Sequence, residues 1–204
     1  MTSNRLQVLS SVVFYIVISA ISGCARSPQA AAAPPRPLPD FAATVVGERG
    51  AAPFSRADLL GRTWVVDFIY TRCQGPCPTL SANMSRLQKS LPDSVGLLSF
   101  TVDPDHDAPA VLARYARRFG ADSRRWLFAT GDKAALMKLY RDGFLIPVAE
   151  SAAAAPGQNI AHTTTFVLLD RRARVLGYYD GEDASDLARL SAAAAALSSG
   201  RASR

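Results

Sequence analysis

Two continuous apolar runs, separated by a helical pattern, restrict most strongly what this chain can fold into. The runs are TWVVDFIY at residues 63–70 and VGLLSFTV at residues 95–102. Runs of this kind are typical of strands that are buried on both faces of a parallel sheet. Between them, apolar residues recur every three or four positions, which predicts a helix that begins near Cys77. We therefore expect two parallel strands joined by a crossover helix.

The rest of the chain continues this alternation. The predicted strands are at 126–130, 164–170 and 175–180, and the predicted helices are at 109–120, 132–140 and 184–197. Alternating strands and helices, followed by a hairpin and a last helix, match the order of a thioredoxin-like fold. We expect an α/β domain with a central mixed sheet flanked by helices. An N-terminal strand pair extends this domain, and residues 143–161 form an insertion loop before the strand that carries His162.

The N-terminal segment has the layout of a secretory signal. Its one charged residue is Arg5, which is followed by an apolar stretch, by small residues and by Cys24. The apolar stretch is shorter than the roughly 20 residues that a membrane-spanning helix needs. Ile21-Ser22-Gly23-Cys24 resembles a bacterial lipobox, in which the cysteine is lipidated and becomes the new N-terminus. We expect a lipoprotein anchored to a membrane through Cys24, outside the cytoplasm on the periplasmic side.

These signals divide the chain into four parts. Residues 1–23 are the predicted signal peptide, and residues 24–39 are rich in proline and alanine. Such a composition cannot build a core and predicts an extended tether. The folded domain is expected over residues 40–198, and residues 199–204 are expected to be a disordered tail.

The charge pattern gives little support to nucleic-acid binding. The formal net charge is +6 over 204 residues, but the basic residues are scattered, with short clusters at residues 117–118, 124–125 and 171–172. No predicted helix has a basic face interleaved with aromatic side chains, which a nucleic-acid interface would favour. We expect a solvated basic surface and no nucleic-acid partner.

Cys73 and Cys77 carry the chemistry that the sequence predicts. With Cys24 acylated they are the two remaining thiols, so the chain has one local pair and no disulfide framework. The spacing resembles the Cys-Gly-Pro-Cys motif of thioredoxins with one extra residue. At the start of a helix, unpaired N–H groups and the helix dipole favour a thiolate over a thiol. A thiolate both attacks disulfides and binds soft metals, so the pair alone fits either a redox centre or a metal site.

Three other residues bear on this choice. Asp67, six residues before Cys73, occupies the place of the buried aspartate of thioredoxins, and is a candidate proton acceptor. His162 stands at the start of a buried strand, which in a thioredoxin-like fold lies beside the cysteine motif. His106 lies in a polar loop, where a solvated role is expected. A static disulfide between the two cysteines is a further alternative, although so short a loop removes little unfolded-state entropy.

Three motifs resemble those of the Sco/SenC family, the copper chaperones of cytochrome c oxidase assembly. They are FIYTRCQGPCP, TVDPDHDAPAVLARYA and AHTTTFVLLD, and they occur in the family's order between residues 40 and 185. The resemblance implies that Cys73, Cys77 and His162 bind copper; Cu(I) is the expected form, and the sequence leaves open whether Cu(II) also binds. It implies as partner the oxidase subunit that carries the CuA site. Ala108 stands where family members often have threonine, so a helix cap is expected to be missing there.

The same thiols suit a rival function from another class. A thiol–disulfide oxidoreductase could reduce the cysteines of the CuA site or of other extracytoplasmic proteins, with electrons from a thioredoxin-like reductant. Asp67 would then matter more than His162. A thiol peroxidase with Cys73 as the reactive thiol is a weaker alternative, because the sequence offers no convincing arginine partner. The sequence leaves open whether metal transfer or thiol reduction dominates.

Overall fold

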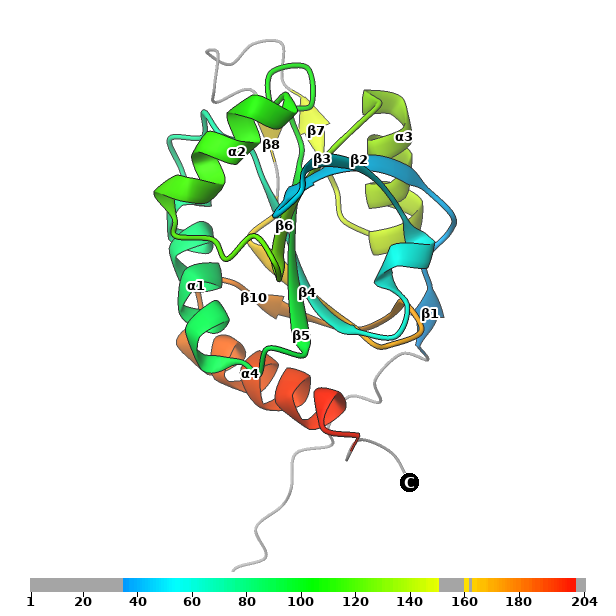
Figure 1. Ribbon diagram of the computed structural model, residues 1–204, viewed down its shortest axis with the longest axis vertical. Coiled ribbons are helices and arrows are strands. Elements are labelled where there is room, and N and C mark those ends of the chain that lie inside the picture. The colour runs from blue at the N-terminus through cyan, green and yellow to red at the C-terminus, as the bar shows by residue number, and fades with distance from the viewer. Residues whose placement is uncertain (1–34, 151–159, 162, 201–204) are drawn as a thin grey trace, which may run out of the picture. The chain divides into compact units, whose positions relative to one another are not determined.

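The computed structural model describes residues 35–150, 160–161 and 163–200, which form an α/β domain around an eight-stranded sheet (Figure 1). The strands follow the order β1-β10-β9-β4-β5-β6-β2-β3. They are β1 Arg36–Pro37, β2 Ala42–Gly47, β3 Gly50–Ser55, β4 Thr63–Ile69, β5 Val95–Thr101, β6 Trp126–Thr130, β9 Thr165–Leu169 and β10 Arg174–Asp180. The helices are α1 Cys77–Ser90, α2 Pro109–Arg118, α3 Lys133–Lys138 and α4 Ala184–Ser198, with shorter turns at η1 Arg56–Leu59 and η2 Leu139–Phe144.

The centre of the sheet is parallel and its flanks are antiparallel. β4 pairs with β5 and β5 with β6 in parallel, whereas β9 and β2 join this centre in the antiparallel direction. β10 is antiparallel to β9 and so runs in the direction of β4. The ends of β4, β5, β6 and β10 therefore meet at one end of the sheet. We call it the cysteine end, because the loop with Cys73 follows β4 there.

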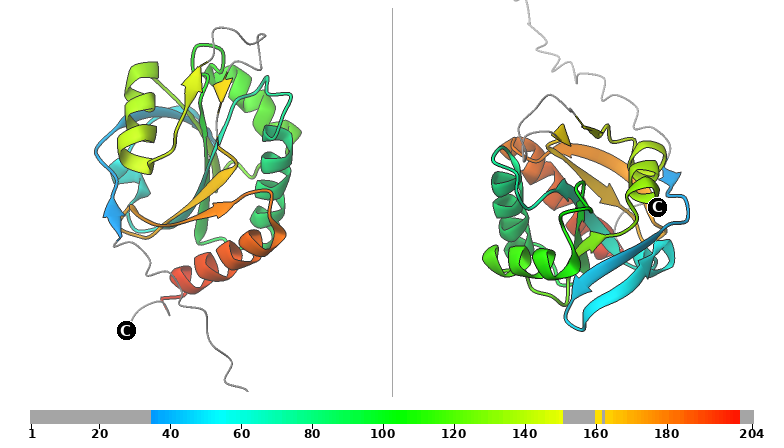
Figure 2. Two further views of the ribbon diagram at one scale, coloured as in Figure 1. Left: turned by 180° about the vertical axis from the view of Figure 1, so that it is seen from behind. Right: turned by 90° about the horizontal axis from the view of Figure 1, so that it is seen from above.

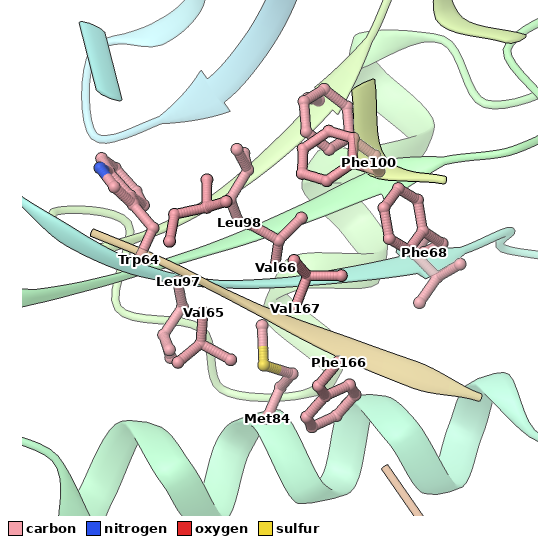
Figure 3. Packing of buried hydrophobic residues seen from close by; sticks show 14 of the residues in the cluster. Trp64, Val65, Val66, Phe68, Met84, Leu97, Leu98, Phe100, Phe166 and Val167 are labelled. Carbon is pink, nitrogen blue, oxygen red and sulfur yellow. The ribbon is translucent and has the colours of Figure 1, made fainter. Parts of the chain in front are cut away.

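The two faces of the sheet are covered by different elements, as Figure 2 shows from behind and from above. α1 and α4 lie on one face, where Val65 points towards Met84 of α1 (Figure 3). On the other face, the rings of Phe68 and Phe100 meet Tyr140 and Phe144 at centroid distances of 5.2 to 5.7 Å. Because side chains alternate along a strand, this arrangement buries both faces of β4 and β5.

Most of the predicted elements are confirmed. β6 has the predicted bounds, and β4, β5, α1, α2 and α4 differ from the prediction by two residues at most. Ser55 caps the turn η1 through Asp58, and Asp132 caps α3 by accepting from the Ala135 N–H at 2.8 Å. The helix predicted to run through Tyr140 ends earlier, since Lys138 is followed by a π-helical turn over Leu139–Phe144.

The sheet begins before the expected start of the domain at residue 40. Arg36 and Pro37 form β1 against β10, and Leu38 is buried with its N–H bonded to the Ala173 carbonyl at 3.0 Å. Arg36 also donates to the carbonyl of Gly143 at 3.2 Å. The last residues of the proline-rich segment are therefore part of the domain, while residues 1–34 and 201–204 lie outside the described part.

The insertion predicted at residues 143–161 contains a short strand pair. β7 Ala149–Glu150 pairs with β8 Ile160–Ala161 in the antiparallel direction, and residues 151–159 lie outside the described part. Among the described residues, no helix combines the length and the apolar character that crossing a bilayer requires.

Candidate functional site

Cys73 and Cys77 lie where β4 passes into α1. Cys77 is the first residue of α1 and is fully buried, whereas Cys73 is half-buried in the loop before it. The Cys73 N–H donates to the Tyr70 carbonyl at 3.2 Å, and its sulfur accepts from the Gly75 N–H at 3.3 Å. Pro76 precedes the helix and Pro78 occupies its first turn, where a missing N–H costs nothing. Both cysteines are thiols, so the static disulfide is not the form that the structure presents.

The two thiols interact, and their environment opposes ionisation of the inner one. The hydrogen bond with Cys73, followed by burial, raises the pKa of the Cys77 thiol. Burial, and then a hydrogen bond to Cys73, raises the pKa of the Tyr70 phenol. The expectation that the helix N-terminus favours a thiolate therefore fails for Cys77, because burial and the neighbouring sulfur outweigh the helix dipole.

Asp67 lies close enough to Cys77 to influence its thiol. It is fully buried in β4, and the alternation of the strand puts it on the same face as Val65, towards α1. Besides Cys73 and burial, the charge of Asp67 raises the pKa of Cys77. A carboxylate so deep in a core is costly and typical of a functional position. The structure therefore places this predicted site residue next to the pair.

A polar brace that we did not predict holds the cysteine loop. Asp107, fully buried, accepts from the Thr71 N–H at 3.0 Å and from the Thr71 and Thr101 hydroxyls at 2.5 and 2.6 Å. Arg72 bonds to Asp103 at 2.7 Å. The two aspartates come from the VDPDHDAP segment after β5, so the signal was present in the sequence as a motif without an assigned role. The brace fixes the start of the loop against the end of β5.

His162 lies outside the described residues, but the chain immediately after it is well anchored. The Thr164 carbonyl accepts from the Gly181 N–H at 2.8 Å, and the Gly181 carbonyl accepts from the Asn83 side chain of α1 at 2.7 Å. Thr163 and Thr165 bond through their side chains. The segment that follows His162 is thereby tied to the helix that begins at Cys77.

The other predicted residues are placed as follows. His106 is exposed in the loop after β5, as expected, and Ala108 precedes α2 without a side-chain cap. Cys24 lies outside the described part. Within the described part, no group of three histidine, cysteine, aspartate or glutamate residues could hold a metal.

Most of this chain matches the model of one known family. The SCO1/SenC family model matches residues 41–197. A SCO1 protein homolog of Bacillus subtilis (strain 168) is 31% identical over 132 residues, which cover 62% of this chain and 66% of that protein. A Stutzerimonas stutzeri protein whose name states copper binding is 33% identical over 91 residues, 43% of each chain. The chain thus spans just under two thirds of the first relative and less than half of the second.

Solved structures agree with this match. The crystal structure of a SCO1/SenC family lipoprotein from Bacillus anthracis str. Ames is 33% identical, with a TM-score of 0.65 over 78% of this chain and 99% of that one. BsSco, described as a member of the Sco family of cytochrome c oxidase assembly proteins with a disulfide switch, is 26% identical, with a TM-score of 0.66 over 81% of this chain and 95% of that one. The thioredoxin-like fold is thereby confirmed. The chain belongs to the SCO1/SenC family.

Proposed function

We propose that this protein is a copper-binding chaperone, tethered to a membrane outside the cytoplasm, that delivers copper to the CuA site of cytochrome c oxidase during assembly. The observation that carries the proposal is the pair of adjacent thiols, Cys73 half-exposed and Cys77 buried, at the start of α1. Soft sulfur ligands select Cu(I). The S. stutzeri relative is named for copper binding, and BsSco is described as an oxidase assembly protein.

Copper is the cargo of this site, so the site must also release it. Each thiol loses its proton when it binds the ion, and the single charge of Cu(I) offsets one of the two negative charges that the thiolates then carry. We assign His162 as the third ligand, because Thr164, two residues after it, is tied through Gly181 to Asn83 of α1, the helix that begins at Cys77. A site with three ligands and one half-exposed sulfur leaves room for a sulfur of the oxidase subunit to displace them one at a time.

A second function uses the same thiols. In a thiol–disulfide oxidoreductase, Cys73 attacks a disulfide of the target, and Cys77 then displaces the target's sulfur to leave a disulfide in this protein. The observation that favours this function is Asp67, which is buried beside Cys77 and could take its proton. The reduced form would be restored by a thioredoxin-like reductant.

Two variants of the reduced protein separate these functions. If copper transfer dominates, His162→Ala should weaken Cu(I) binding by about 10-fold or more, as loss of ligand support does, and leave the rate of disulfide reduction nearly unchanged. If thiol reduction dominates, Asp67→Asn should slow thiol exchange by about 100-fold and leave copper affinity near the wild type. We expect the first pattern. Competition titration with a Cu(I) chelator and stopped-flow reduction of a model disulfide provide the two readouts.

His106→Ala is the matched control, because His106 is exposed in a loop and its loss should change neither readout. Wild-type copper affinity in His162→Ala would contradict the third-ligand assignment. The tether has its own test, since mass spectrometry of the mature N-terminus should find Cys24 acylated. An intact bond between Gly23 and Cys24 would remove the lipid anchor from the proposal.

A further inference from the structure

Arginines that are scattered along the chain come together at the end of the sheet opposite Cys73. This end is formed by the starts of β4, β5, β6 and β10. We define the arginine band as the basic residues that flank these strand starts: Arg62, Arg124, Arg125, Arg171, Arg172 and Arg174. Two of the three arginine clusters noted in the sequence thus lie at the same end of the fold.

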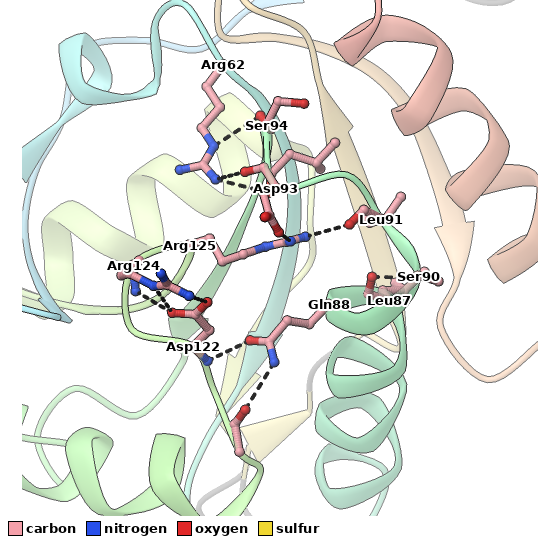
Figure 4. A network of polar contacts seen from close by, with 12 residues as sticks. Arg62, Leu87, Gln88, Ser90, Leu91, Asp93, Ser94, Asp122, Arg124 and Arg125 are labelled. Carbon is pink, nitrogen blue, oxygen red and sulfur yellow. Dashed lines mark hydrogen bonds and ion pairs between the residues drawn. The ribbon is translucent and has the colours of Figure 1, made fainter.

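Side-chain hydrogen bonds and an ion pair connect the members of the band to one another. Arg171 donates to the Gly61 carbonyl at 2.9 Å, next to Arg62. Arg62 in turn donates to the carbonyls of Asp93 and Ser94 at 2.6 and 3.2 Å, and Arg125 pairs with the Asp93 carboxylate (Figure 4). The band therefore runs from the β9–β10 turn across the start of β5 to the start of β6.

The acids within the band leave an excess of positive charge. Asp93 pairs with Arg125, Asp122 with Arg124 and Asp170 with Arg174. No acidic side chain of the described part pairs with Arg62, Arg171 or Arg172, and the latter two are exposed. An exposed guanidinium in excess is suited to phosphate oxygens, which it can bind in a bidentate manner.

Charge at the cysteine end has the opposite sign. Asp180, Glu182 and Asp183 surround the passage from β10 to α4, and Asp132 follows β6. The basic residues Arg72 and Lys133 of this end each pair with an aspartate of the loop after β5, so the other acids leave an excess of negative charge. The domain is therefore polarised along the sheet. A negatively charged surface would attract the arginine band and repel the end that carries Cys73.

We propose that the arginine band docks on the surface of an anionic phospholipid bilayer, with the cysteine end turned away from it. Charge complementarity supports this occupant, and so does the course of the chain. β1 pairs with the start of β10 at this same end, so the described chain enters the sheet beside the band, and the segment that precedes Arg36 in the sequence contains the apolar stretch. Docking of the arginine band does not require bound copper.

Arginine footprinting on the full chain tests this docking. The protein is mixed with vesicles of phosphatidylcholine alone or of phosphatidylcholine with phosphatidylglycerol, and phenylglyoxal labelling of each arginine is followed by mass spectrometry. Labelling of Arg171 and Arg172 should slow by at least about 5-fold on the anionic vesicles, the contribution expected of one arginine at such a surface. About 1 M salt should abolish the effect, because the Debye length falls to about 3 Å. Arg86 and Arg114, exposed on α1 and α2, should label equally on both vesicles.

Charge variants make the test specific. Arg171→Ala with Arg172→Ala should remove the protection of Arg124, whereas Arg86→Ala with Arg114→Ala removes equal charge elsewhere and should keep it. Arg171→Lys with Arg172→Lys should also keep the protection of Arg124. Equal labelling of wild-type Arg171 and Arg172 on both vesicles would overturn the proposal, even if a variant fails to fold. Protection by duplex DNA and not by phosphatidylglycerol would overturn it in favour of a nucleic-acid surface.

Discussion

The two cysteines of the site are chemically unequal, although they stand only four positions apart in the sequence. Cys77 has no exposed surface, and its hydrogen bond with Cys73 and its burial both raise the pKa of its thiol. Cys73 is half-buried and therefore within reach of solvent. An incoming ion or disulfide will meet Cys73 first, and Cys77 will complete the exchange.

Alkylation with iodoacetamide should reveal this order. In the folded, reduced protein we expect Cys73 to react at least about 10-fold faster than Cys77, because thiolate character and access control the rate. At a pH above 9.0, the usual pKa of a thiol, the unfolded chain loses the Cys77 proton while the folded state still keeps it. Stability should therefore be fully present below that pH and fall as the pH rises beyond it. Equal alkylation rates of Cys73 and Cys77, followed by mass spectrometry, would contradict the expected difference between the two thiols.

Asp107 stabilises the cysteine loop without touching either sulfur. Its buried carboxylate accepts three hydrogen bonds from Thr71 and Thr101, so Asp107→Ala would leave three donors without an acceptor. We expect a loss of about 2–4 kcal/mol in the free energy of unfolding, together with weaker copper binding. Urea denaturation provides the measurement. Asp105→Ala, which removes an exposed pair with Lys133, is the control and should cost about 0–1 kcal/mol.

At the scale of elements, Gly181 in the turn after β10 closely approaches both α1 and the residue before β9. A Cβ at this position would lie 2.6 Å from the Thr164 carbonyl oxygen and 2.6 Å from the Leu80 side chain. Glycine is therefore required for the contact that ties the chain after His162 to α1. Larger residues would force the segment and the helix apart.

Gly181→Ala should for this reason destabilise the domain by about 1–3 kcal/mol, the usual cost of overpacking, and weaken copper binding if His162 is the third ligand. Thermal unfolding and a Cu(I) titration measure the two effects. Gly131→Ala is the matched control, since a Cβ there meets its nearest atoms at ordinary distances of 3.4 to 3.8 Å. A stable Gly181→Ala protein with unchanged copper affinity would show that this contact does not position the site.

The elements that could be predicted from sequence are those whose pattern is local. Apolar runs predict the strands β4 and β5, and an apolar spacing of three to four residues predicts the helix α1. The position of Asp132 just before a helical pattern predicts the cap of α3. The π-helical turn at Leu139–Phe144 has no such spacing of its own. The strand at Arg36 could not be foreseen in a proline-rich segment, because its partners are the Ala173 and Gly143 regions far along the chain.

In the candidate site, too, features with a local sequence pattern could be predicted, and features that depend on distant residues could not. Cys73 and Cys77 could be found from their spacing, and Asp67 from its distance to them. The hydrogen bonds from Thr71 to Asp107 could not be predicted from the sequence, since the two residues are 36 positions apart. The upward shift of the Cys77 thiol pKa could not be predicted from the sequence either, because the packing of α1 on the sheet decides how deeply this thiol is buried.

For the whole domain, copper should act as a stabilising ligand of the reduced form alone. A ligand that binds the folded state at about 100 times its Kd adds about 2.7 kcal/mol, which raises the Tm of a domain of this size by about 5–10 °C. Oxidation to a disulfide removes both sulfur donors, so the oxidised protein should show no shift. Calorimetry of the two forms with and without Cu(I) decides this, and equal shifts in both would contradict a thiolate site.

The pairing of β1 with β10 also determines how the protein can be handled. The described chain begins at β1 and ends after α4, and both points lie away from the loop that carries the cysteines (Figure 1). An affinity tag, a fluorescent reporter or an electrode linker can therefore be joined before Arg36 or after Gly200 without covering Cys73. A sensor built in this way would present its sulfur pair to the sample, with the attachment chemistry on the far side.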